Sequence, residues 1–227
     1  MNEEMITLQE TAAEQQKNLA DSRLYRIPKR FIDIICGFIG CLVLIPLAIL
    51  VKVCYLCERD FHPIFFKQER IGKNGKPIYI YKFRSMVPNA DAVLMKMLSE
   101  DEEVAREYKR YKKLKNDPRI TRIGKFIRNT SIDEVPQFLN VLKGDMSLVG
   151  PRPYLFREKE DMGEYYDIVI KCKPGITGYW QVNGRSNTDF GKRLVLDEYY
   201  YYHRNLNLDA RIVGKTFAQV IMKKGVM

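Results

Sequence analysis

Several residue patterns that would point to particular protein classes are missing from this chain of 227 residues. Its five cysteines do not form the regular framework of a secreted, disulfide-stapled domain, which favours a reducing, cytoplasmic environment. Two of them, Cys54 and Cys57, have C-x-x-C spacing, but no second pair or histidine cluster accompanies them, which disfavours a zinc or redox site. The N-terminus lacks the basic start and apolar core of a signal peptide. A disulfide-rich or exported class is therefore not expected.

Basic residues outnumber acidic ones, with 38 Lys and Arg against 28 Asp and Glu and a formal net charge of +10. This excess favours anionic partners such as nucleic acid, membrane headgroups or phosphorylated substrates, and charge does not choose among them. The hydrophobic content of 46% is enough for one domain with appendages. The patterns divide the chain into a polar N-terminal tail (1–22), an apolar segment expected to insert into a membrane (23–59) and a remaining domain (60–227).

An apolar run from Phe31 to Val51, preceded by basic residues, is long enough to be a membrane segment. Pro46 removes a backbone hydrogen bond and should kink or break a helix there, leaving two arms that are each too short to cross a bilayer. Basic residues flank both ends, which favours placing both on the cytoplasmic face. A re-entrant helix broken at Pro46 and a kinked spanning helix are equally compatible, and a buried core helix is a third option. Asp33 should form an ion pair with a preceding basic residue.

Residues 65–86 predict a β-hairpin, because two alternating segments surround the turn signal Asn74-Gly75. The alternation places Lys82 and Arg84 on one strand face, where two cations could bind a phosphate. A solvated strand face is the alternative. Helical spacing of apolar residues predicts a helix from Asn89 to about Lys115.

Two further segments combine basic and apolar residues. Residues 119–128 carry four basic side chains, including Arg128, among aliphatic ones, and would suit a membrane surface or a polyphosphate. Residues 209–224 predict an amphipathic helix that either lies at the membrane interface or packs on the domain. The expected fold is therefore α+β and mostly helical, with interfacial helices and a small hairpin.

Adjacent carboxylates at Asp133 and Glu134 form the most informative motif. Ser131 and Glu134 have capping-box spacing, so the acids could simply start a helix. Pro136 would then fall inside that helix, which favours a start one or two residues later, with Asp133 at or near the cap and ionised. An ionised aspartate is a candidate nucleophile toward phosphorus, and a neighbouring glutamate suits Mg²⁺. Both interpretations remain open from spacing alone.

Two later segments could bind a phosphorylated ligand. Arg152 lies between Pro151 and Pro153, which stiffen the backbone that presents its guanidinium, although a structural ion pair is the usual role of such a residue. Residues 173–186 form a Gly-rich stretch that holds the only tryptophan and could surround a nucleotide.

Taken together, these motifs resemble the bacterial sugar transferase family, also called polyprenyl-phosphate hexose-1-phosphate transferases or monotopic phosphoglycosyl transferases. The resemblance runs from about residue 25 to the C-terminus. It depends on several ordered motifs, which are Lys29–Asp33, Phe66–Gly72, Lys82–Met86, Ser131–Gln137, Gly150–Pro153 and Lys173–Gly178. One departure is Ile45, since the family often has serine before the helix-breaking proline.

The resemblance implies transfer of hexose 1-phosphate from a UDP-sugar to undecaprenyl phosphate with release of UMP, initiating exopolysaccharide, capsule or O-antigen synthesis. By analogy Asp133 is the nucleophile that forms a covalent phosphosugar intermediate, and Glu134 holds Mg²⁺. The implied phosphate and nucleotide contacts are Lys82, Arg84, Arg128, Arg152 and Arg185.

The resemblance also implies a re-entrant helix and a cytoplasmic active site at the bacterial inner membrane. The expected partners are a UDP-sugar carrying galactose or glucose, undecaprenyl phosphate and membrane lipid, not nucleic acid, with a homodimer as a further candidate. The competing hypothesis is a membrane-anchored basic module that binds polyanions without catalysis.

Overall fold

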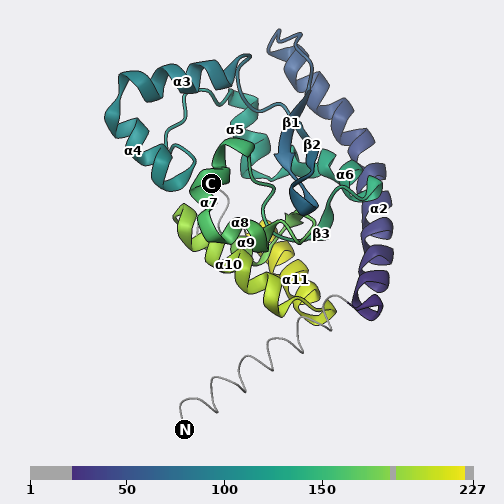
Figure 1. Ribbon diagram of the computed structural model, residues 1–227. Coiled ribbons are helices and arrows are strands. Elements are labelled where there is room, and N and C mark those ends of the chain that lie inside the picture. The colour runs from purple at the N-terminus through teal and green to yellow at the C-terminus, as the bar shows by residue number, and fades with distance from the viewer. Residues whose placement is uncertain (1–21, 185–187, 223–227) are drawn as a thin grey trace.

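A computed structural model describes residues 22–184 and 188–222 of the chain. The predicted polar tail of residues 1–22 lies outside this part except for Ser22. As predicted, the fold is α+β and mostly helical (Figure 1). The long helix α2 (Arg23–Cys57) runs along one side of the molecule, and two small sheets lie near its centre.

Helix α2 is continuous over 35 residues and contains both Pro28 and Pro46. At about 1.5 Å per residue it is roughly 50 Å long. Figure 1 shows that it changes direction part-way along its length. The helix continues through Pro46, so the chain is not broken into two helices there. Bending is the expected result when proline removes one hydrogen bond and crowds the preceding turn.

The two faces of α2 differ in how far their side chains are buried. One face packs on the domain through a stripe of buried residues from Tyr25 to Tyr55. The other presents large apolar side chains to the outside, among them Leu24, Ile27, Phe31, Phe38, Ile45, Ile49 and Leu50. Within the described part of the chain, α2 is one helix that is long and apolar enough to cross a membrane. These features indicate membrane association.

Polar side chains near the start of α2 bind the end of helix α6 (Phe138–Lys143) and the segment that follows it. Arg30 donates to the carbonyl oxygens of Val141 and Leu142, at 2.7 and 2.8 Å. Asp33 is buried and accepts from the hydroxyl of Ser147 and the amide of Leu148, at 3.0 and 2.8 Å. It has no ion pair with any described residue, so the expected pairing with a preceding basic residue is wrong. Hydroxyl and amide donors satisfy this buried carboxylate instead.

Small residues allow α2 and α6 to approach closely. A Cβ atom added at Gly40 would lie 2.1 to 2.5 Å from ring carbons of Phe138, and one added at Gly37 would lie 3.1 Å from the amide nitrogen of Leu142. Any larger side chain at Gly40 would therefore push the two helices apart.

The predicted hairpin is confirmed. Strands β1 (Phe65–Ile71) and β2 (Pro77–Phe83) pair antiparallel, with Phe65 opposite Phe83 and Ile71 opposite Pro77. The connection contains the 3-10 turn η1 (Lys73–Gly75), in which Asn74 and Gly75 both have positive φ. These residue types tolerate that conformation, which explains the position of the turn.

The predicted single helix of residues 89–115 is two helices, α3 (Ala90–Glu100) and α4 (Glu102–Tyr111). Asp101 separates them because its carboxylate caps α4, accepting from the amides of Glu103 and Val104. This pair lies on the opposite side of the molecule from α2 (Figure 1).

The remaining chain surrounds the hairpin with short elements. The sequence prediction missed a parallel pairing of β3 (Ser147–Val149) with β4 (Gly175–Thr177). The predicted C-terminal helix is α11, which buries Ile212 in a core cluster with Val149 and Tyr200. The other elements are α5 (Arg122–Asn129), η2 (Ile132–Gln137), η3 (Phe156–Glu158), α7 (Lys159–Met162), η4 (Gly163–Tyr165), α8 (Tyr166–Val169), α9 (Tyr179–Asn183), α10 (Phe190–His203) and α11 (Leu206–Met222).

The close packing of α2 on α6 leads to a first prediction. Gly40→Ala should lower the free energy of unfolding by about 1–3 kcal/mol, because the new methyl group overlaps the Phe138 ring. Gly214→Ala in α11 is the matched control: nothing lies within 4 Å of a Cβ atom added there, so alanine should be neutral or slightly stabilising. Thermal unfolding in lipid nanodiscs measures both variants. Equal melting temperatures would show that the two helices are not in close contact.

Candidate active site

Asp133 and Glu134 lie in η2, the short 3-10 helix between α5 and α6. Its N-cap residue, Ser131, has left-handed backbone geometry and makes no side-chain cap hydrogen bond. The capping-box interpretation is therefore wrong, because that motif requires this bond. The helix begins at Ile132, directly after Ser131 and not one or two residues later as predicted, so Asp133 is its second residue and lies near the cap.

Strand β2 fixes the position of this turn through Asn140, a fully buried residue of α6. The Asn140 side chain donates to the carbonyl of Tyr79 at 2.7 Å and accepts from the amide of Tyr81 at 3.1 Å. These two bonds give partners to backbone groups at the edge of β2 that would otherwise have none. The carboxylate pair is thereby held beside the end of β2 that carries Lys82.

Three of the predicted cations gather around the carboxylates. The ammonium of Lys82 lies 2.7 Å from Oε1 of Glu134. Arg128, at the end of α5, donates from Nε to the hydroxyl of Ser85 at 2.8 Å, and its charge acts on Asp133. The charge of Arg152 acts on Glu134. The structure thus brings together five residues that the sequence singled out, from four separate segments.

Arg152 is positioned by contacts behind it. Its backbone amide donates to the buried carboxylate of Asp197 in α10 at 3.2 Å, and the same oxygen accepts from the hydroxyl of Tyr154 at 2.7 Å. The carbon atom of its guanidinium lies 5.8 Å from the ring centre of Trp180. The guanidinium N–H groups make no hydrogen bond to another described residue. The side chain is therefore supported but keeps its donors available for a ligand.

A cavity with about 350 Å³ of empty space adjoins these residues. Its polar lining consists mainly of hydrogen-bond donors and cations, together with the Glu134 carboxylate. The residues that line it are Arg70, Ile80, Lys82, Glu134, Gln137, Arg152, Pro153, Gly175, Ile176, Trp180 and Gln181.

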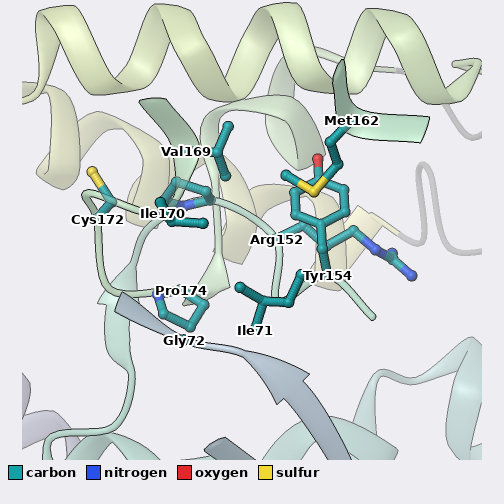
Figure 2. A pocket seen from close by; sticks show the side chains of 10 residues that line it. Ile71, Gly72, Arg152, Tyr154, Met162, Val169, Ile170, Cys172 and Pro174 are labelled. Atoms are coloured by element: carbon teal, nitrogen blue, oxygen red, sulfur yellow. The ribbon is translucent and has the colours of Figure 1, made fainter. Parts of the chain in front are cut away.

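A second, smaller cavity of about 240 Å³ lies behind the Arg152 loop and is mainly apolar. Figure 2 shows Ile71, Val169 and Met162 among its lining side chains, while the guanidinium of Arg152 points away from them. This cavity belongs to the packing that supports the loop, and the charged end of Arg152 is directed elsewhere.

Two predicted site residues are not part of this group. Arg84 follows the last residue of β2 and donates to the carboxylate of Asp60 and the carbonyl of Pro63, both at 2.9 Å. It also lies over the ring of Tyr55, so its role is to hold the end of α2 against the hairpin. Arg84 and Lys82 therefore have different partners in this structure, and a phosphate contact of Arg84 stays a prediction. Arg185 lies outside the described residues.

The two carboxylates have different pKa values. Burial raises the pKa of Asp133 to about 6, with the charge of Glu134 acting in the same direction and those of Lys82 and Arg128 opposing it. Burial also raises the pKa of Glu134, but the charge and hydrogen bond of Lys82 outweigh it, and the net effect lowers that pKa. Asp133 is therefore mostly ionised at pH 7, and Glu134 is fully ionised.

The donor set suits a metal that is shared with a ligand. The described residues contain no cluster of three or more His, Cys, Asp or Glu side chains that could enclose a metal ion. Mg²⁺ is commonly held by one or two carboxylates together with phosphate oxygens and water. Asp133 and Glu134 fit that arrangement.

Sequence reasoning missed several residues of this region. Arg70 stands within a motif that carried the family resemblance, yet nothing in its spacing assigned it a role. Gln137 and Asn140 follow the carboxylate pair closely, and their burial was the signal that sequence could not supply. Asp197 lies in a tyrosine-rich helix that gave no sign of its contact with Arg152.

An apolar helix docked along a basic domain with a donor-lined cavity defines a membrane-associated protein suited to anionic ligands. Comparison with known proteins identifies the family. Residues 24–223 match the family model described as bacterial sugar transferase. The chain therefore belongs to the bacterial sugar transferase family, as the resemblance predicted.

Individual relatives agree with this assignment. The chain is 43% identical over 210 residues to undecaprenyl-phosphate galactose phosphotransferase of Salmonella typhimurium, covering 92% of this chain and 44% of that protein. It is 36% identical over 211 residues to UDP-glucose:undecaprenyl-phosphate glucose-1-phosphate transferase of Escherichia coli, with 89% and 42% covered. It is 35% identical over 201 residues to exopolysaccharide production protein ExoY of Rhizobium meliloti, with 87% of each covered. The chain thus spans less than half the length of the first two.

The burial of Asp133 leads to a second prediction. In the folded protein its carboxyl group should titrate near pH 6, well above an exposed aspartate, and Lys82→Met should raise that pKa further because a neighbouring positive charge is lost. Carboxyl-carbon NMR of protein labelled at aspartate measures this, with Asp133→Asn identifying the signal. An Asp133 signal that titrates near pH 4 would contradict the burial of this group.

Proposed function

We propose that this chain transfers a hexose 1-phosphate from a UDP-sugar to undecaprenyl phosphate and releases UMP. The reaction would initiate exopolysaccharide, capsule or O-antigen synthesis at the cytoplasmic face of the bacterial inner membrane. Galactose and glucose are the proposed sugars, since the relatives from Salmonella typhimurium and Escherichia coli are named for these two.

The observation that carries this proposal is the environment of Asp133. Asp133 is 8% exposed as a residue, and its carboxylate accepts no hydrogen bond from a described side chain and lies near the charges of Lys82 and Arg128. A carboxylate that is ionised but poorly solvated is a stronger nucleophile than one in water, and the adjacent cations attract a phosphorylated substrate.

The proposed reaction has two displacements at one phosphorus atom. A carboxylate oxygen of Asp133 attacks the phosphorus that bears the sugar, and the bond from that phosphorus to the oxygen bridging the two phosphates breaks. UMP leaves with the bridging oxygen. An oxygen of undecaprenyl phosphate then attacks the same phosphorus, breaks its bond to Asp133 and restores the carboxylate. The bond between the sugar and its phosphate oxygen is never broken.

The other site residues would balance charge during these steps. Lys82, Arg128 and Arg152 supply positive charge where two phosphate groups and a carboxylate must come together. Glu134, with phosphate oxygens of the donor, would hold Mg²⁺, which neutralises phosphate charge when bound.

The attachment of α2 supports the re-entrant placement. Near its start, Lys29 pairs with Asp209 of α11 at 2.6 Å, and Tyr25 donates to the same carboxylate at 3.0 Å. Near its end, the hydroxyl of Tyr55 donates to the carbonyl of Arg84 at 2.5 Å. Both ends of the helix are therefore bound to one domain, which favours their lying on one side of the membrane. In this placement the site lies at headgroup level, within reach of a soluble donor and a lipid acceptor.

Asp133→Asn should abolish transfer, with a loss of about 10³-fold or more, because an amide cannot form the covalent intermediate. Incubation with radiolabelled UDP-sugar without lipid acceptor should leave label on denatured wild-type protein and none on the variant. Asp167→Asn, at an exposed position, is the matched control and should retain label. Label on the Asp133→Asn protein would refute the nucleophile.

An assay of UMP release separates the enzyme from the competing hypothesis of a non-catalytic polyanion-binding module. Release of UMP from UDP-galactose or UDP-glucose in the presence of undecaprenyl phosphate supports the enzyme. Absence of UMP release across the common UDP-sugars would favour the binding module.

Glu134→Gln should weaken the binding of the Mg²⁺ that supports transfer, because a neutral amide is a poorer ligand for a hard cation than a carboxylate. We expect the Mg²⁺ concentration that gives half-maximal activity to rise by about tenfold or more. A Mg²⁺ titration of the transfer rate measures it, with the exposed variant Glu164→Gln as the control. An unchanged titration would remove Glu134 from the proposed metal site.

A further inference from the structure

Four buried side-chain nitrogens in the described part of the chain have no hydrogen-bond partner at normal distance and angle. One is Nη1 of Arg84, and the other three belong to residues that line one cavity: Nε of Arg70, Nε2 of Gln137 and Nε1 of Trp180. These three come from different elements, β1, η2 and α9. Buried donors are nearly always paired, so three exceptions around one cavity point to a ligand that accepts from them.

Arg70 is the strongest of the three observations. Its side chain is almost fully buried, with Nη1 donating to the carbonyl of Pro153 at 2.9 Å and Nη2 to the side-chain oxygen of Gln68. No described carboxylate lies within ion-pair distance of it. Burial and the neighbouring charge of Arg152 lower its pKa to about 10. The charge of Glu158 opposes this shift without forming a direct ion pair, and an anion bound beside Arg70 would offset the remaining cost of burying its charge.

Gln137 and Trp180 add geometry to this charge. Gln137 is 2% exposed, lies in the same turn as the carboxylate pair and acts as a donor toward Glu134, which lowers the pKa of that carboxylate. Its amide carries two N–H groups, so a ligand can accept from the second. Trp180 has the guanidinium groups of Arg152 and Arg193 over its ring, at 5.8 and 5.1 Å from the ring centre. The indole is therefore fixed, and its N–H group is a donor only.

The chemistry of the lining defines the class of ligand. Arg70, Lys82 and Arg152 are positively charged, and Gln137 and Trp180 contribute further donors. The Glu134 carboxylate is already bound by Lys82. A ligand that satisfies this lining must present several acceptor oxygens and negative charge, which a phosphoryl group does.

We propose that this cavity binds the phosphoryl group of the uridine nucleotide, with Arg70, Gln137 and Trp180 as its donors. This inference rests on the proposed function and deepens it. A nucleotide phosphate fits better than the lipid phosphate because no residue of α2 lines the cavity, whereas hairpin and α9 residues do. The cavity thus lies among elements of the domain and away from the membrane helix.

The test uses the intrinsic fluorescence of Trp180, the only tryptophan of the chain, in full-length protein held in lipid nanodiscs. Titration with UMP, uridine and a short-chain polyprenyl phosphate gives three Kd values. UMP should bind at least about tenfold more tightly than uridine, because only UMP carries the phosphoryl group. Arg70→Met should reduce that preference to about twofold or less while leaving the Kd for uridine unchanged.

Two further variants complete the design. Gln137→Leu should reduce the preference by several-fold and keeps the test decisive if Arg70→Met does not fold. Arg106→Met, on the exposed surface of α4, is the matched control and should keep the full preference. A loss of folding alone would weaken UMP and uridine binding equally, which the ratio of the two Kd values does not register.

Three outcomes would overturn the assignment. The first is a wild-type protein that binds uridine as tightly as UMP. The second is retention of the full preference in both Arg70→Met and Gln137→Leu. The third is weakened binding of polyprenyl phosphate with unchanged binding of UMP, which would assign the cavity to the acceptor lipid. UMP binding of the expected pattern without any transfer by the wild type would instead refute the proposed function and leave the pocket assignment intact.

Discussion

The polar contacts between the start of α2 and residues 141–149 determine how the rest of the molecule is arranged. Arg30 binds carbonyl groups at the end of α6, where a helix has unpaired acceptors, and Lys29 donates to the carbonyl of Val149 at 3.0 Å. The bound segment lies between the turn of the carboxylate pair and the loop of Arg152. Displacement of α2 would therefore move both halves of the site, so the membrane helix and the catalytic domain are one structural unit.

Burying charged groups in and around the site lowers the free energy of unfolding. The pKa of Asp133 is raised above its value in an unfolded chain, so the folded protein holds this proton more tightly. Its burial therefore destabilises the fold above about pH 6, and that penalty disappears as the pH falls below about 4. The buried cations Arg70 and Arg193 add a further penalty, since burial lowers the pKa of each to about 10. Apolar packing and the buried hydrogen bonds of Asn140 must offset these costs of burying charge.

Local patterns in the sequence were enough to predict α2, the hairpin and the C-terminal helix, because each depends on periodicity and turn residues within one segment. They could not place the β3–β4 pairing, whose strands are far apart in the chain. Arg84 shows why strand alternation alone did not predict a side chain's contacts. It lies one residue after the end of β2, and its hydrogen-bond partners Asp60 and Pro63 precede the hairpin. The cations around the carboxylates were found by residue type, whereas Arg70 and Gln137 required knowledge of burial.

The attachment of α2 also has a consequence for biogenesis. The acceptor of Lys29 in α11 is 180 residues further along the chain, so the helix leaves the ribosome long before that partner exists. At about 5–20 residues per second the delay is roughly 10–40 s. During this interval the apolar face can enter lipid while Lys29, Arg30 and Asp33 are still without their final partners. Insertion would thus precede tertiary folding, and the bilayer would hold α2 in place while the remainder of the polypeptide is translated and assembles onto it.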